Sequence, residues 1–227
     1  MEGLWLRADR QGSGRGRQGR SWLSPPGNLY ASTLVHLQPE DPPAPTLTLL
    51  AAVALHEAVS LYAEDVRIKW PNDLVACSPA KAGAQAGARP GLRPPPEHLE
   101  WAKLAGILLE RQLDAVIVGF GVNLVHHPDL PGRAATSLKA LAGAAPEPAV
   151  FAEALAEIFA RWLARWRQEG PDPILHAWRA AAHPRGTPLA TSEGNGLFDG
   201  LDETGALRLR LADGAIRVIH AGDVFVI

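Results

Sequence analysis

The sequence predicts an α+β protein, in which a mixed or antiparallel sheet with flanking helices is followed by a small all-β unit. Two apolar runs, 104–110 and 115–124, are separated by only four residues, and so short a connection favours an antiparallel hairpin. Two longer segments, 46–64 and 149–169, repeat apolar side chains at helical spacing. From residue 186 onward, short apolar segments alternate with turn residues, which is typical of a small β unit.

The remaining elements follow from similar local patterns. Residues 78–98 are rich in Ala, Gly and Pro and have almost nothing to bury, so we predict a flexible surface insertion there. We expect a first domain over residues 1–182 and a second over residues 183–227. The further expected elements are strands at 3–8, 28–37, 66–70 and 74–77 and a helix at 173–182.

Charge and cysteine content limit the function classes. The 227-residue chain has a formal net charge of −2, which argues against a general nucleic-acid binder. Positive charge is instead concentrated between residues 7 and 20, where five arginines accompany one acidic residue, Asp9, and this favours a small anionic ligand. Cys77 is the only cysteine, which fits a reducing cytoplasm. The sequence shows neither a secretory signal pattern nor an apolar run of the roughly 18 residues that span a membrane.

The stretch RQGSGRGRQGRSW, residues 10–22, combines flexible glycines with arginine donors that suit carboxylates and phosphates. Its GRGRQG segment formally matches a dinucleotide-binding fingerprint, and GRGRQGRS nearly matches a P-loop. Both motifs need a helix directly after the glycines, and the SWLSPPGN that follows cannot form one. These residues alone therefore leave a loop that folds around an anion, a solvated loop, or an RNA-contacting segment.

Two other stretches place polar residues where predicted strands begin or end. KWPNDL, residues 69–74, sets a cation, an aromatic ring, an amide and a carboxylate around a proline, which is typical of a site built at the end of a strand. A plain β-turn without a functional role is the alternative interpretation. Lys103 opens the apolar strand KLAGILLE, either as an edge charge or as a point charge for a phosphate or carboxylate. GFGVN, residues 119–123, ends the partner strand with glycines that leave room for a flat ligand.

GRGRQGRSW, KWPNDL, KLAGILLE and VGFGVNL, in this order, closely resemble the motifs of the biotin protein ligases. The resemblance extends from about residue 7 to the C-terminus, and the small β unit resembles that family's SH3-like C-terminal β-barrel. It implies a biotin/lipoate ligase-like catalytic fold and an enzyme that uses biotin and ATP with Mg²⁺. By this resemblance, the biotin carboxylate attacks the α-phosphorus of ATP to give biotinyl-AMP, and a lysine of a biotin carboxyl carrier protein then displaces AMP.

The resemblance also implies roles for residues of the four motifs. The implied catalytic residues are Lys103, Arg17 and Asp73. Biotin is expected to contact Gln11, Gly14, Arg15, Gly16, Arg17, Lys103, Gly119 and Gly121. The adenylate is expected to contact Arg15, Arg17, Arg20, Trp22, Asn123 and Lys103, with adenine stacked on the indole. Mg²⁺ is expected to arrive on the ATP phosphates, with Asp73 as the candidate protein ligand.

The sequence departs from the family before the arginine-rich loop. Family members normally carry a Ser-Thr-Asn segment and a helix there, and that segment forms one wall of the biotin pocket. This sequence has no such segment, so either its start is placed too late, or it is a shortened form and a catalytically impaired biotin- or nucleotide-binding module of the same fold is the alternative. It also has no room for an N-terminal DNA-binding domain, so we expect a ligase that binds neither DNA nor membrane. Many relatives pair through sheet edges, which makes a homodimer a further expectation.

Overall fold

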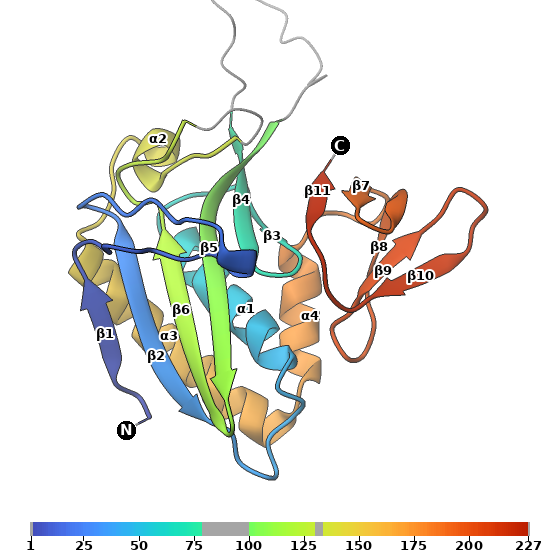
Figure 1. Cartoon of the computed structure of the whole chain (residues 1–227), viewed down its shortest axis with the longest axis horizontal. Helices are drawn as coiled ribbons and strands as arrows, with labels where there is room; N and C mark the ends of the chain where they lie inside the picture. The colour runs from blue at the N-terminus through green and yellow to red at the C-terminus, as the bar shows by residue number, and fades with distance from the viewer. Residues whose placement is uncertain (1, 79–99, 130–133, 227) are drawn as a thin grey trace, which may run out of the picture.

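The computed structural model describes residues 2–78, 100–129 and 134–226. Its main sheet has six strands in the order β1-β2-β6-β5-β4-β3 (Figure 1). Every neighbouring pair is antiparallel, so the sheet is antiparallel rather than mixed. The insertion expected at 78–98 lies outside the described residues, apart from Ser78 at the end of a strand. The strands are β1 (Trp5–Ala8), β2 (Leu29–His36), β3 (Val66–Lys69), β4 (Asp73–Ser78), β5 (Glu100–Gln112) and β6 (Ala115–Val122).

Three helices cover one face of the main sheet and leave the opposite face to loops (Figure 1). α1 (Thr46–Ser60) lies between α3 (Pro148–Glu169) and α4 (Asp172–Ala181) and also contacts the strands. Eleven α1 residues are buried, because neighbours surround this helix on several sides. The helix ends earlier than the sequence predicts, at a point where the next apolar residue, Leu61, is already 62% exposed.

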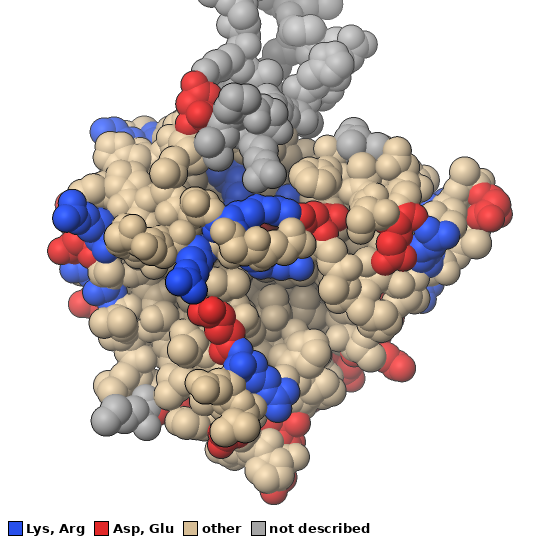
Figure 2. All heavy atoms as spheres, viewed as in Figure 1, with Lys and Arg blue, Asp and Glu red and all other residues tan. Residues whose placement is uncertain are grey.

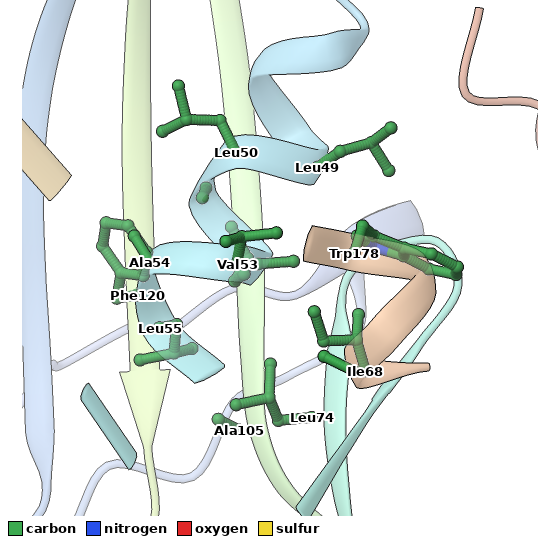
Figure 3. Packing of buried hydrophobic residues seen from close by; sticks show 14 of the residues in the cluster. Leu49, Leu50, Val53, Ala54, Leu55, Ile68, Leu74, Ala105, Phe120 and Trp178 are labelled. Carbon is green, nitrogen blue, oxygen red and sulfur yellow. The ribbon is translucent and has the colours of Figure 1, made fainter. Parts of the chain in front are cut away.

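The hydrophobic core lies between α1 and the sheet. Figure 3 shows Leu50 and Leu55 of α1 gathered with side chains from three strands, Leu74, Ala105 and Phe120. All five are at most 3% exposed. Burial of one such large apolar side chain contributes roughly 1.5–3 kcal/mol, so the contact between helix and sheet is a major source of stability.

A short helix, α2 (Leu138–Ala142), has no counterpart in the sequence prediction, because five residues are too few to show a period. Its first turn is capped by Ser137, whose side chain accepts a hydrogen bond from the Ala140 amide at 3.3 Å. The residues just before this cap run alongside the start of β5, where the Lys103 amide donates to the Ala134 carbonyl at 2.8 Å. The cap therefore also anchors a segment that borders Lys103.

The C-terminal unit is a second antiparallel sheet, in the order β10-β9-β8-β7-β11. Among the described residues, the two outer strands β10 and β11 do not pair with each other. The SH3-like unit expected from the sequence is thus a five-stranded antiparallel sheet whose described strands show no closing pair. Its strands are β7 (Pro188–Thr191), β8 (Gly194–Leu201), β9 (Leu207–Arg210), β10 (Ile216–Ile219) and β11 (Val224–Val226).

The second sheet shares a hydrophobic core with the first unit. Phe198 and Leu207 belong to the same cluster of buried side chains as α1. The Trp70 indole N–H donates to the Gly205 carbonyl at 3.1 Å. A Cβ added to Gly205 would lie 2.6 Å from the Leu49 Cδ1 atom, so the two units meet too closely for any side chain there. The sheets are thus docked firmly, and the domain boundary at 182/183 stays a prediction.

Candidate active site

A cavity of about 780 Å³ opens on the face of the main sheet that the helices leave free. Figure 2 shows Lys and Arg side chains gathered around this hollow, with acidic side chains beside them. The lining comes from the arginine-rich loop, from β5 and β6, and from the turn before β11. Of the site residues predicted from the sequence, all except Gly14 line it: Gln11, Arg15, Gly16, Arg17, Arg20, Trp22, Asp73, Lys103, Gly119, Gly121 and Asn123.

The arginine-rich loop is folded back on itself. The Gly16 amide donates to the Arg20 carbonyl at 2.7 Å, and the Trp22 amide donates to the Gly14 carbonyl at 2.9 Å. Between them lies the 3₁₀ turn η1 (Arg17–Gly19). A Cβ on Gly14 would lie 2.7 Å from the Ser24 hydroxyl oxygen, so this glycine permits close packing inside the loop. In this structure Gly14 therefore shapes the loop and does not itself line the cavity, unlike the biotin contact expected for it.

The Trp22 ring rests on two paired glycines of the sheet. A Cβ added to Gly121 would lie 2.7 Å from the Trp22 Cε2 atom, and one added to Gly106 would lie 3.2 Å from Cζ3. These two glycines face each other across β5 and β6. The space that Gly121 was expected to leave for biotin is thus filled by the indole. The Lys103 ammonium lies 5.4 Å from the centre of the same ring, within cation–π range.

Lys103 reaches the cavity because of a β-bulge. β4 and β5 pair Leu74 with Ala105 and then Val75 with Lys103, so Leu104 is one extra residue on β5. The bulge shifts the side-chain alternation of the strand. Leu104 and Ala105 are both fully buried in the core, whereas Lys103 lines the cavity. This single irregularity turns the amine toward the ligand side of the sheet.

Asp73 holds two lysines at the cavity wall. Its Oδ1 atom lies 2.6 Å from the Lys103 Nζ atom, and its Oδ2 atom lies 3.4 Å from the Lys69 Nζ atom. Both carboxylate oxygens are therefore already engaged by cations, and direct coordination of Mg²⁺ by Asp73 would require an ion pair to open. Within the described ranges, no group of three or more His, Cys, Asp or Glu side chains could hold a metal ion.

Asn123 is placed as a support for Lys103. Its side chain is buried, and its Nδ2 atom donates to the Thr136 carbonyl at 3.1 Å. The Thr136 amide in turn donates to the Lys103 carbonyl at 2.9 Å. The Asn123 side chain, which was expected to contact the adenylate, thus donates to the backbone beside Lys103.

The chain matches known proteins over most of its length. Residues 3–123 match the Biotin/lipoate A/B protein ligase family, and residues 192–226 match the Biotin protein ligase C terminal domain. A biotin--[acetyl-CoA-carboxylase] ligase of Paracoccus denitrificans is 38% identical over 97% of this chain and 89% of the relative. The chain belongs to the biotin protein ligase family.

A second sequence relative and a solved structure are similar to this chain over almost its whole length. A bifunctional ligase/repressor BirA of Bacillus subtilis is 31% identical over 98% of this chain and 66% of the relative. The solved biotin protein ligase of Aquifex aeolicus in complex with biotin and ATP has a TM-score of 0.79 at 25% identity, covering 100% of this chain and 90% of that one. In the part of the ligase that the structure describes, no helix is long and apolar enough to cross a bilayer.

The arginines of the ligase reach partners that sequence reasoning missed. The Arg17 Nη1 atom donates to the Asn72 Oδ1 atom and to the Gly222 carbonyl, both at 3.2 Å. The Arg20 guanidinium pairs with Asp223, and it holds the pKa of that carboxyl below its ordinary value. Gly222 and Asp223 sit in an Ala-Gly-Asp turn that resembles the other turns of the C-terminal unit, so the sequence gives no signal for them.

Proposed function

We propose that this biotin protein ligase joins biotin to ATP in the 780 Å³ cavity and passes it to a lysine of a carboxylase biotin carrier domain. The decisive observation is that cations from separate motifs, Arg15 and Arg17 from the loop and Lys103 from β5, line one cavity together with Trp22. A solvated or RNA-contacting loop would not be expected to place its arginines in the same cavity as Lys103. Sequence relatives named as biotin ligases, and a solved relative in complex with biotin and ATP, support the same reaction.

The first step must bring two anions together. A biotin carboxylate oxygen forms a bond to the α-phosphorus of ATP, and the bond from that phosphorus to the leaving pyrophosphate breaks with its electron pair. Arg17 suits this step because its hydrogen-bond partners among the described residues, Asn72 and the Gly222 carbonyl, are neutral oxygens, so no ion pair has to open before it meets a phosphate. Arg15 lines the cavity without a side-chain hydrogen bond to any described residue. Such placed donors offset the repulsion as charge develops on the phosphorus.

Lys103 is the proposed central cation of both steps. Its ammonium is held by Asp73 and lies over the Trp22 ring, between the places proposed for the biotin carboxylate and the α-phosphate. In the second step the acceptor lysine amine, having lost a proton, attacks the carbonyl carbon of the mixed anhydride. AMP leaves with the electron pair of the broken C–O bond, and the nitrogen sheds its remaining extra proton. Lys103 would stabilise the departing phosphate as a point charge.

The uncharged parts of the substrates have proposed places along the same wall. Gln11 and the backbone at Gly16 border the loop side of the cavity and are proposed to meet the biotin ring, with Gly119 on the sheet beside them. Adenine is proposed to stack on Trp22, a contact worth roughly 1–3 kcal/mol. Mg²⁺, when bound, would neutralise the ATP phosphates, with Asp73 able to reach it only after releasing a lysine.

Two further expectations stay predictions. We propose that the protein acts as a ligase without a repressor role, and that two copies pair through a sheet edge. β1 and β3 are the outer strands of the main sheet. Size measurement in solution and a titration with duplex DNA at several salt concentrations test these two points separately.

Biotin-dependent exchange of labelled pyrophosphate into ATP tests the proposed reaction. We expect exchange by the wild-type protein, and a loss of roughly 100- to 1000-fold for Lys103→Ala, the range found when one preorganised charge-stabilising donor is removed. Lys139→Ala is the matched control, because Lys139 is an exposed lysine of α2 outside the cavity. Full exchange by Lys103→Ala would remove this lysine from the mechanism. A folded wild-type protein that binds biotin without exchange would support the impaired binding module instead.

A further inference from the structure

Two arginines of the catalytic loop contact the C-terminal sheet. Arg20 pairs with the Asp223 carboxylate, and Arg17 donates to the carbonyl of the adjacent Gly222. The arginines and their partners are about 200 positions apart in the sequence, with separations of 203 and 205 residues. Figure 2 shows acidic atoms directly beside the cationic rim of the hollow, on the side of the C-terminal sheet. The second sheet therefore reaches the wall of the active site.

The two arginines are held by different kinds of acceptor. Arg17 donates to neutral oxygens and makes no ion pair among the described residues, although its charge also helps to lower the pKa of the nearby Asp223 carboxyl. Arg20 donates to a carboxylate and also to the Gln18 side-chain oxygen at 2.7 Å. A guanidinium that is already paired with a carboxylate has less attraction left for a phosphate, since its nearest anion belongs to the protein. The two residues thus differ: Arg20 is paired with a protein carboxylate, whereas Arg17 hydrogen-bonds only neutral oxygens and is the more available of the two for a substrate.

We propose that Arg20 and Asp223 form a tether between the arginine-rich loop and the C-terminal sheet, and that this tether positions Arg17 for the substrate phosphates. This inference rests on the proposed function of the cavity. Asp223 and Arg20 are then positioning residues, and Arg17 is the residue that binds the substrate.

The flexibility of the loop explains why a tether is needed. The loop contains Gly12, Gly14, Gly16 and Gly19, and its turn also places Gln18 at a positive φ of 56°. Such a segment has many accessible backbone conformations, so Arg17 would sample many positions if nothing held its loop. Asp223 fixes the loop to the turn that supplies the Gly222 carbonyl to Arg17. The tether therefore orders the loop and keeps one acceptor of Arg17 in place.

The exposure of the pair indicates that its effect is on position rather than on folding. The side chains of Arg20 and Asp223 are 39% and 26% exposed. Partly solvated ion pairs contribute little to folding stability. Phe198, Leu207 and the Trp70–Gly205 hydrogen bond hold the two units together without it. Loss of the tether should thus leave a folded protein with a misplaced Arg17.

Charge exchange tests the tether directly. We expect Arg20→Asp and Asp223→Arg each to raise the KM for ATP in pyrophosphate exchange by roughly tenfold, within the range of couplings between contacting charged residues. In the double variant the pair is re-formed with reversed charges, so the KM should return to within about threefold of wild type. If Arg20 itself bound the phosphates, the double variant would be no better than the poorer single variant. That result would overturn the proposal.

A second measurement does not depend on catalysis, so it separates failure of the tether from failure of the proposed function. Trypsin cleaves after arginine, and Asp223→Asn should free the loop, so cleavage after Arg15 or Arg17 becomes several-fold faster than in wild type. Asp199→Asn is the matched control, because Asp199 pairs with arginines of the same sheet away from the cavity. Equal cleavage of wild type and Asp223→Asn would overturn the tether. Tether-dependent cleavage without any wild-type exchange would overturn the proposed reaction alone.

Discussion

The two faces of the six-stranded sheet differ in what their side chains contact, although neighbouring residues of the same strands supply both. Leu74 and Leu104 are fully buried beneath the helices, whereas Asp73 and Lys103, directly before them, line the cavity. Because strand side chains alternate between faces, one short segment can serve the core and the site at once. Substitutions on the helix-covered face should therefore change the stability, and substitutions on the open face should change the activity.

The largest expected effect comes from the helix-covered face. Leu50→Ala removes a fully buried side chain from the contact between α1 and the sheet, so we expect a loss of about 2–5 kcal/mol in the free energy of unfolding. Urea denaturation measures it, and Leu61→Ala, at the exposed end of the same helix, should change the stability little. Pyrophosphate exchange per folded molecule should be close to wild type in both. A loss of pyrophosphate exchange in folded Leu50→Ala would contradict the expectation that the helix-covered face affects stability alone.

His183 is a buried titratable group that should make the stability depend on pH. His183 is 6% exposed, stacks edge-on against Trp101, and has no hydrogen-bond partner on either ring nitrogen among the described residues. Burial lowers its pKa from 6.5 to about 4, with a further contribution from Lys69 and Arg67. The unfolded state therefore binds the proton more readily. Stability from this neutral ring is present above pH 6.5 and is lost as the pH falls toward 4.

The expected size follows from the shift of the His183 pKa. Between pH 7 and pH 4 wild type should lose about 3 kcal/mol more than His183→Leu, which has no titrating group at this position. Urea unfolding at several pH values measures both proteins. Parallel pH profiles would show that the ring is not held neutral by the interior.

The smallest expected effect compares two glycines on the open face. Gly121→Ala would place a Cβ 2.7 Å from the Trp22 ring, whereas Gly119→Ala would meet only the Leu108 carbonyl oxygen at 3.4 Å. We expect Gly121→Ala to displace the indole, at a cost of roughly 1–3 kcal/mol in ATP binding, and Gly119→Ala to change it much less. Calorimetric titration with ATP gives both values. Equal affinities for the two variants would contradict the seating of Trp22 on Gly121.

Much of the fold follows from local patterns. The hairpin of β5 and β6 was predicted because two apolar runs flank a short connection, and α3 was predicted from its helical spacing. The end of α1 was wrong, because the apolar pattern continues past Ser60 although the chain leaves the helix there and turns Leu61 to solvent. The C-terminal β unit was also predicted, whereas the turn spacing does not show that its outer strands β10 and β11 stay apart.

The residues that line the cavity could be predicted where they belong to a distinctive sequence motif. Lys103, Trp22, Arg15, Arg17 and Arg20 were proposed because their motifs are distinctive in order; all five line one cavity, and their roles stay predictions. Two placements depend on packing that no spacing reveals: the burial of Asn123 and the seating of Trp22 on Gly121. Asp223 was missed because its contact with Arg20 is set by how the second sheet docks, which a turn sequence does not encode.

The bulge at Leu104 gives β5 one more core side chain than regular pairing would allow. Deleting Leu104 would leave Val75 opposite Lys103 and Leu74 opposite Ala105, so the lysine would still face the cavity and only the buried leucine would be lost. Straightening the strand with all its residues kept would instead move Lys103 by one position and carry its amine to the core side. A shorter strand should therefore fail in stability before it fails in activity.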